Sequence, residues 1–193
     1  MDKSDKEQIA LYMRGDVNAL SELVERYRRP LFGFIIKMTE GKDDADEIFQ
    51  EIWVRAIKHI DRYEDRKLLS WLFRIAHNLI IDRARRRKDL VSLDQENEHE
   101  HALSEVLPGT GPSPADDSGN EDLRLRIRTA VEALPDEQKE VFLMRMEGDL
   151  SFKEIAKIQG TSINTALGRM QYALQKLRGA LAEDYALLGR NPT

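Results

Sequence analysis

The chain of 193 residues contains no cysteine, so it can form neither a disulfide nor a thiolate metal site. It also lacks a run of about 20 apolar residues, the length that a membrane-spanning helix requires. Its first residues, MDKSDKEQ, carry neither the apolar segment of a signal peptide nor the arginine-rich bias of a transit peptide. Few stretches alternate like strands, and long ones repeat with helical spacing. We therefore predict an all-α cytoplasmic protein.

Motifs of catalysis are missing as well. The chain has no glycine-rich phosphate loop and no nucleophile elbow. The acidic cluster at residues 43–47 fits a helix N-terminus, where negative charge is stabilising. His99 and His101 lie among glutamates, and solvated histidines explain that pattern more simply than a metal site does. We expect a binding protein with no enzymatic activity, no metal and no cofactor.

Charge divides the chain into three parts. The formal net charge is −5, yet residues 89–123 contain ten acidic residues and no lysine or arginine, which leaves both flanking parts mildly basic. Residues 89–120 combine acids with Gly, Pro and Ser and have few apolar anchors, so they cannot bury enough surface to offset the entropy of ordering. We predict two small helical domains, 1–88 and 121–193, joined by a flexible acidic linker, 89–120.

The first domain is predicted to contain four helices. Asp16 caps a helix that reaches Tyr27, and Pro30 marks a break or kink before residues 31–38. A helix from residue 46 has one apolar stripe, made of Phe49, Ile52, Trp53, Ala56 and Ile60. Val54 and Ile57 fall on its polar side instead, beside Gln50. An exposed apolar pair of this kind indicates a surface for a partner.

The following helix combines an apolar stripe with positive charge. Its stripe consists of Leu68, Leu72, Ile75, Ala76 and Leu79. Other faces carry basic groups, an amide and neighbouring aromatic rings, which suit a single nucleic-acid strand whose phosphates are neutralised and whose bases stack. Trp71, at the edge of the stripe, also fits a core position. The predicted strand-binding residues are Tyr63, Trp71, Phe73, Arg74, Asn78, Arg83, Arg85 and Arg86.

The second domain ends in a helix-turn-helix pattern. A helix marked by Leu123, Ile127, Ala130, Val131 and Leu134 stops at Pro135, and Asp136 is predicted to cap the next one. Ser151 with Glu154 forms a capping box that opens a short helix, which Gly160 ends. Thr161 or Ser162 then caps the last helix, whose predicted buried stripe is Ile163, Leu167, Met170, Leu174, Leu177 and Leu181.

The outer face of the last helix suits a DNA major groove. The predicted duplex-binding residues are Ser162, Asn164, Thr165, Gly168, Arg169, Tyr172 and Lys176. The alternative is a solvated face on a helical hairpin. The capped short helix and the tight turn favour DNA binding over that alternative.

Several segments resemble the extracytoplasmic-function (ECF) group of bacterial sigma factors in the sigma-70 family. Residues 46–88 are similar to region 2 through the D-E-x-x-Q-E run at 46–51, Tyr63, the Ser-Trp-Leu at 70–72, the Ile-Ala-His-Asn at 75–78, and Asp82 with the arginine run. Residues 15–27 resemble the start of that region. Residues 134–156 and the final helix resemble region 4. The resemblance covers nearly the whole chain outside the linker.

The resemblance implies a promoter-specificity subunit of RNA polymerase. Asp46, Glu47, Gln50 and Glu51 would dock on the clamp helices of the β′ subunit, with Val54 and Ile57 beside them. The strand-binding residues would hold unpaired bases of the −10 element, and the last helix would read the −35 duplex. The acidic linker would thread near the polymerase cleft and the RNA exit path as a mimic of nucleic-acid charge. The β subunit would be a further partner, and an anti-sigma factor would hold the protein inactive.

One part of the pattern departs from the family. The last helix has Leu167 and Tyr172 where the family has basic residues, and Gly168 where it has serine. Two phosphate contacts are therefore missing, and we expect a weaker −35 interaction with a shallower salt dependence. The main rival to a sigma factor is a free-standing helix-turn-helix regulator that never joins polymerase, followed by a module that only binds an anti-sigma-like protein.

Overall fold

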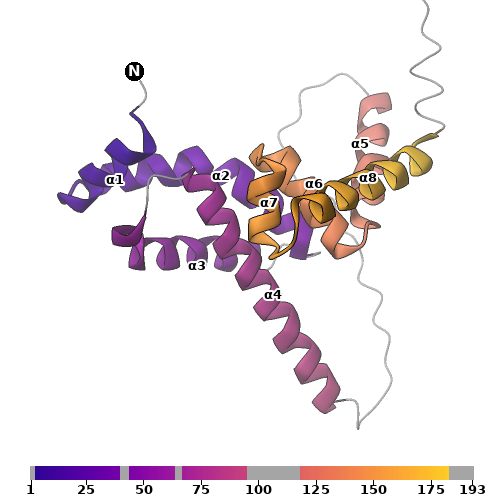
Figure 1. Cartoon of the computed structure of the whole chain (residues 1–193), viewed down its shortest axis with the longest axis horizontal. Helices are drawn as coiled ribbons and strands as arrows, with labels where there is room; N and C mark the ends of the chain where they lie inside the picture. Colours follow the sequence, from indigo (N-terminus) through magenta and orange to yellow (C-terminus); the bar gives the residue numbers. More distant parts are fainter. Residues whose placement is uncertain (1–2, 40–43, 64–66, 95–117, 183–193) are drawn as a thin grey trace, which may run out of the picture.

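A computed structural model describes residues 3–39, 44–63, 67–94 and 118–182. Within these residues the chain forms eight α-helices, one short 3-10 helix and no strand, which confirms the all-α prediction. The helices are α1 (Asp5–Met13), α2 (Val17–Thr39), α3 (Ala45–Lys58), α4 (Leu68–Asp94), α5 (Ser118–Glu132), α6 (Asp136–Gly148), α7 (Phe152–Ile158) and α8 (Ile163–Ala180), with the 3-10 helix at Ile60–Arg62 (Figure 1). We call α1–α4 the first half and α5–α8 the helix-turn-helix half.

In the first half, α2 is the long central helix. It runs through Pro30 without interruption, so the predicted break does not occur. Proline removes one backbone donor from the helix. The residues that follow it, Leu31, Phe34 and Ile35, are fully buried, and their packing keeps the segment helical. Helix α1 is held against α2 by Asp5, which accepts a hydrogen bond from Arg26 at 2.7 Å.

The predicted apolar stripes of α3 and α4 are confirmed, apart from Ile75, which is only partly buried. All five residues of the first stripe are buried, although Ile60 lies in the 3-10 helix, and so are the remaining four of α4. Helix α4 continues to Asp94, past residue 88, and its C-terminal part projects away from the body of the molecule (Figure 1). Residues 95–117 of the predicted linker, with His99 and His101, lie outside the described residues, whereas residues 118–120 form the start of α5.

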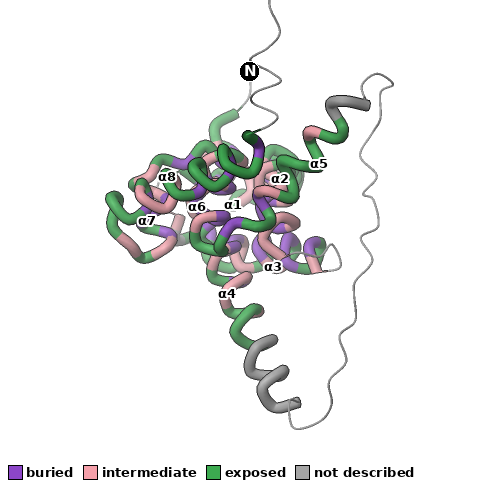
Figure 2. The backbone as a smooth tube through the Cα atoms, turned by 90° about the vertical axis from the view of Figure 1, so that its right-hand side faces the viewer, coloured by how far each residue is buried: buried purple, intermediate pink, exposed green. Residues whose placement is uncertain are grey.

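The helix-turn-helix half begins with α5, which is mostly exposed and stands away from the body (Figure 2). Ile127, predicted to be buried, is exposed, because only the last turns of α5 reach the core. Helix α6 is preceded by Pro135 rather than by a capping Asp136. Helix α7 has the predicted capping box, in which the backbone N–H of Glu154 donates to the Ser151 hydroxyl at 3.3 Å.

The predicted buried stripe of α8 is wrong at three of its positions. Ile163, Leu167 and Leu174 are 46%, 38% and 36% exposed. The face that packs against the rest of the half is instead centred on Ala166, Ala173 and Leu177, with Met170 and Leu181 beside them. Alanine side chains allow neighbouring helices to approach closely, so the face of α8 that carries its smallest apolar residues packs against the core.

The two halves pack on each other. Helix α6 lies along α2, and α7 reaches α4 (Figures 1 and 2). One hydrophobic cluster runs through both halves and includes Phe34, Phe73 and Met144. The rings of Phe34 and Phe73 meet edge to face with their centroids 5.0 Å apart. An added Cβ at Gly148 would lie 2.8 Å from Phe73 Cε2, so α6 ends against this ring.

Candidate nucleic-acid interface

The outer face of α3 carries the residues predicted to bind a partner. Val54 is 51% exposed, and Asp46, Glu47 and Gln50 are exposed on the same helix. Glu51 is partly engaged, because its carboxylate accepts a hydrogen bond from Arg55 Nε at 2.8 Å. We call this set, which also includes the half-buried Ile57, the α3 surface. It combines acidic side chains with Val54, an apolar side chain that is half exposed to solvent.

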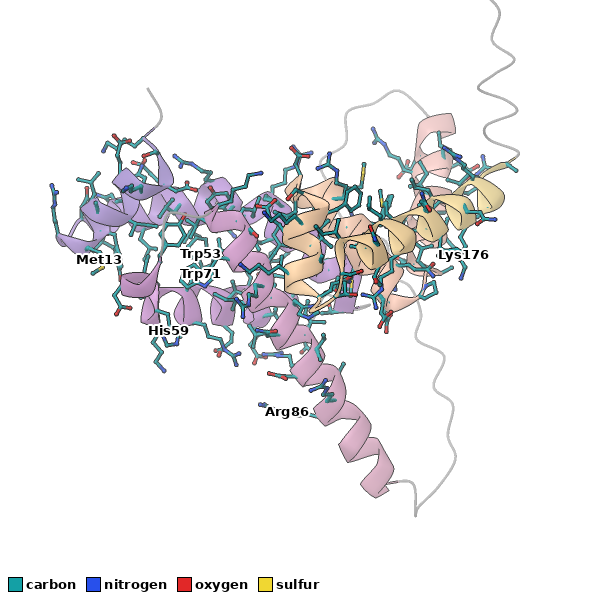
Figure 3. All side chains as sticks on the ribbon, in the orientation of Figure 1. Met13, Trp53, His59, Trp71, Arg86 and Lys176 are labelled. Atoms are coloured by element: carbon teal, nitrogen blue, oxygen red, sulfur yellow. The ribbon has the colours of Figure 1, made fainter. Side chains whose placement is uncertain are left out.

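An ion pair joins the α3 surface to the basic part of α4. Arg83 Nη2 lies 2.7 Å from Glu47 Oε1. Arg85 and Arg86, also predicted to bind a strand, are exposed further along the projecting part of α4, where Figure 3 labels Arg86. The predicted partner surface and the predicted strand surface are therefore adjacent.

A pocket of about 360 Å³ opens between the end of α3 and α4. It is lined by Arg55, His59, Trp71, Ile75 and Asn78. The ring of Tyr63 lies next to Trp71, with the centroids 5.7 Å apart and the planes tilted by 42°. Two predicted strand-binding residues, Trp71 and Asn78, thus line this pocket, and a third, Tyr63, packs against Trp71.

The predicted strand-binding residues omit three residues of this pocket: Arg55, His59 and Ile75, the last of which was assigned to the buried stripe of α4. Arg55 and His59 are four positions apart, and Glu51 precedes Arg55 by the same interval, so all three share one face of α3. That spacing was the signal that could have identified them. A guanidinium, an imidazole, an indole and an amide around one hollow suit a planar base with its attached phosphate.

Phe73 does not belong to this surface. Its side chain is fully buried between Phe34 and the end of α6, so in this arrangement it cannot contact a nucleic acid. Arg74 is exposed on α4, as predicted for a phosphate contact.

On α8 the predicted duplex-binding residues do not all have the same environment. Ser162 caps the helix, since its hydroxyl accepts a hydrogen bond from the backbone N–H of Thr165 at 3.0 Å. Asn164, Thr165, Tyr172 and Lys176 are exposed, and Figure 3 shows Lys176 on α8. Gly168 is half-buried, and an added Cβ there would meet no atom within 4 Å.

The Arg169 side chain makes hydrogen bonds within the protein rather than facing solvent freely. Its Nη1 donates to Gln159 Oε1 at 2.8 Å and its Nη2 donates to Glu137 Oε2 at 2.5 Å. The side chain is only 21% exposed. Arg169 thus fixes α8 against α6 and the end of α7, and its charge is already paired.

Comparisons with known proteins match both halves. Residues 23–89 match the family model of Sigma-70 region 2, and residues 124–177 match that of Sigma-70, region 4. The ECF RNA polymerase sigma factor SigW of Bacillus subtilis is 29% identical over 186 residues, which cover 95% of this chain and 100% of that protein. The RNA polymerase sigma-H factor of Pseudomonas aeruginosa is 24% identical over 187 residues, covering 93% and 94% of the two chains.

A solved structure shares the fold. The sigma factor RpoE from Bartonella quintana, in complex with the anti-sigma factor NepR, superposes with a TM-score of 0.69 at 23% identity, over 86% of this chain and 98% of that chain. In the part of the chain that the structure describes, no helix has the length and apolar character needed to cross a membrane.

Proposed function

Because the chain belongs to the extracytoplasmic-function group of sigma factors, we propose that it binds core RNA polymerase and directs it to promoters through separate −10 and −35 contacts. The observation that carries this proposal is the order of the two matched regions, together with an exposed apolar side chain on α3. The protein acts by binding alone, in the cytoplasm, where its polymerase partner works. The domain bounds we propose remain 1–88 and 121–193.

The α3 surface is the proposed polymerase contact. Its acids would meet basic groups on the β′ clamp helices, and Val54 would be buried against them. The double substitution Gln50→Ala with Glu51→Ala should abolish co-purification with core polymerase. Glu25→Ala is a suitable control, because Glu25 also forms an ion pair within one helix, with Arg28 at 3.0 Å, but lies on α2. Unchanged co-purification of the double variant would instead favour the free-standing regulator.

The pocket between α3 and α4 is the proposed site for an unpaired base of the −10 element. Trp71 and Tyr63 offer ring faces for stacking, and Asn78 offers both a donor and an acceptor. Arg74 and Arg55 would neutralise the adjoining phosphates. Asn78→Ala with Arg74→Ala should reduce open-complex formation much more than binding to duplex promoter DNA, and an equal loss of both would contradict a role in strand capture.

Helix α8 is the proposed reader of the −35 duplex. Asn164 and Thr165 lie in its first turn, where base edges are within reach, and Lys176 would contact a phosphate. Arg169 is already paired, and Leu167 and Tyr172 carry no charge, so few phosphates would be neutralised. The slope of log affinity against log salt should therefore be shallow, and Lys176→Ala should reduce it by about 1.

We also propose an anti-sigma factor as a regulatory partner. The solved structure of the similar RpoE contains one, NepR. The observation on this chain that supports such a partner is the exposed apolar row of Ile163, Leu167 and Leu174 on α8. To test this directly, the intact chain would be purified from a strain in which its activity is not induced. An anti-sigma factor should then co-purify with it.

A further inference from the structure

Four residues form a single row along the outer face of α8. They follow one another at intervals of four, three and four positions, which places them on one face of a helix. We call Thr165, Arg169, Tyr172 and Lys176 the outer row. Thr165, Tyr172 and Lys176 are exposed, with Tyr172 at 62%. By charge alone, Arg169 at the centre of the row would be expected to bind a base.

Arg169 is held away from the row by acceptors on two neighbouring elements. Its Nη1 donates to Gln159 and its Nη2 to Glu137, and its side chain is only 21% exposed, whereas that of Glu137 is 70% exposed. Gln159 is fixed in turn, because its Nε2 donates to the Glu137 carbonyl oxygen at 3.2 Å and to Glu140 Oε2 at 2.6 Å. The guanidinium therefore occupies a defined site, to which Glu137 supplies the negative charge.

This site determines what the outer row can recognise. Arginine recognises guanine by donating two hydrogen bonds to its O6 and N7 atoms, which is the most common specific contact in the major groove. Arg169 is mostly covered and is bonded to Glu137 and Gln159, so it cannot extend to a base while these bonds hold. Hydrogen bonds between a guanidinium and a carboxylate are among the strong ones. The Arg169 position in the row therefore offers no guanidinium to guanine.

The side chains that remain exposed around this position suit A·T base pairs. Asn164 carries an amide, the group that pairs with N6 and N7 of adenine. The Thr165 hydroxyl is hydrogen-bonded to Ser162 Oγ at 2.8 Å, so its methyl group remains for an apolar contact. The Tyr172 ring offers a second apolar surface, and Gly168 leaves space beside it, since an added Cβ there would meet no described atom within 4 Å. Apolar groups recognise the C5-methyl group of thymine.

We propose that Glu137 determines part of the sequence specificity of the duplex contact. By holding Arg169 away from DNA, it excludes a guanine contact from the centre of the outer row, so the chain prefers A·T over G·C at the base pairs that face this centre. Glu137 does not itself contact DNA but acts through the position of Arg169. The proposal rests on the proposed role of α8 as reader of the −35 duplex.

Selection from a pool of promoter duplexes tests this preference with the full chain. Core polymerase carrying the chain is mixed with duplexes that are randomised at both promoter elements, and the bound fraction is sequenced. The parent should enrich A·T at adjacent base pairs of the −35 element. Glu137→Ala removes the charged acceptor and should enrich guanine about ten-fold at one of these positions, which is within the range of a single bidentate contact.

Asp136→Ala is the matched control. Asp136 is exposed in the same first turn of α6, so its loss removes an equal charge. Within the described residues it forms no bond to Arg169, and the variant should keep the parent preference. Glu137→Ala combined with Arg169→Gln should also return to that preference, because the gained contact depends on the guanidinium. Equal selection by Glu137→Ala and Asp136→Ala, or guanine enrichment that survives in the double variant, would overturn the proposal.

The salt dependence of binding is a second readout, which a merely structural role of Glu137 would not change. Once Glu137 is removed, the charge of Arg169 adds to the positive charge that faces the DNA. The slope of log affinity against log salt should therefore become steeper by up to about 0.9, the value for one neutralised phosphate. A slope equal to that of the parent would contradict the release of Arg169.

Tyr172→Arg covers the case in which Glu137→Ala fails to fold. It places a guanidinium in the exposed part of the outer row and leaves the site of Arg169 intact, so it should enrich guanine by itself. No gain of guanine in this variant would overturn the assignment of the row to base edges. A parent that already enriches G·C throughout the −35 element would refute this inference alone. A parent that selects a −10 sequence but no −35 sequence would instead refute the role of α8, so the two failures are distinguishable.

Discussion

Replacing Val54 by aspartate tests the proposed polymerase contact with little disturbance of the fold. Val54 lies on α3 with 51% of its surface exposed, so its side chain contributes little to the core. Aspartate and valine have similar helix propensities, and exposed substitutions usually change stability by less than about 0.5 kcal/mol. The variant should therefore fold normally, and its thermal unfolding should match that of the parent.

The loss of polymerase affinity should be much larger. Burying a whole valine contributes about 1.5–3 kcal/mol. Because about half of Val54 is already covered, burial of the rest at an interface contributes about 1 kcal/mol. A carboxylate in its place would have to lose water against apolar groups, which costs about 2 kcal/mol more even with partial compensation. The sum of about 3 kcal/mol corresponds to an affinity loss of about 100-fold.

Val17→Asp is the matched control. Val17 is also an exposed helical valine, at 67%, but it lies in the first turn of α2, far along the chain from the α3 surface. A negative charge at a helix N-terminus is mildly stabilising, so the control should fold at least as well as the parent. Binding of labelled core polymerase, followed by fluorescence anisotropy, compares the two variants. Equal affinities for Val54→Asp and Val17→Asp would refute the assignment of the α3 surface.

Three further predictions concern the helix-turn-helix half. Arg169→Ala should lower the free energy of unfolding by about 2 kcal/mol in chemical denaturation, because two hydrogen-bonded partners lose a charged donor. Leu177→Ala should cost about 3 kcal/mol and Leu174→Ala less than about 1 kcal/mol, and equal losses would support the original stripe, which contained both residues. Burial works to raise the pKa of Glu154, but the hydrogen bonds of Ser151 and the charge of Lys67 outweigh it and hold this pKa below its usual value. The resulting stability is present above the ordinary pKa of a glutamate and is lost as pH falls through the lowered pKa, so Glu154→Gln should show a smaller acid destabilisation in thermal melts.

The first half was largely predictable because its signals are local. Helices α3 and α4 each have one apolar stripe that repeats over three or more turns, and burial follows that repeat. Of the break or kink predicted at Pro30, the break does not occur, for a nonlocal reason. Losing one hydrogen bond matters less than burying Leu31 and Phe34, and burial depends on residues that α3 and α4 bring from elsewhere in the chain.

The buried face of α8 was predicted wrongly because the size of the side chains, and not their hydrophobicity alone, determined which residues pack against the other helices. The sequence assigned the largest apolar residues to the core, yet α6 and α7 pack so closely on α8 that Ala166 and Ala173 occupy the contact. The same error affected Arg169, which was assigned to DNA by its charge. Its acceptors, Glu137 and Gln159, come from helices whose position relative to α8 no periodicity reveals.

Few features of the sequence indicate the contact between the two halves. Glu140, Glu147 and Glu154 are seven residues apart, which would place them along one side of a continuous helix, but a turn around Asp149 separates α6 from α7. The left-handed conformation of Asp149, with φ at 46°, redirects the chain so that Glu154 reaches Lys67 while Glu140 reaches His77. A non-glycine residue rarely adopts this conformation. Asp149→Gly should therefore relieve backbone strain and keep the direction of α7, whereas Asp149→Val should misdirect α7 and lower the temperature of thermal unfolding; equal unfolding temperatures for the two variants would show that this turn does not position α7.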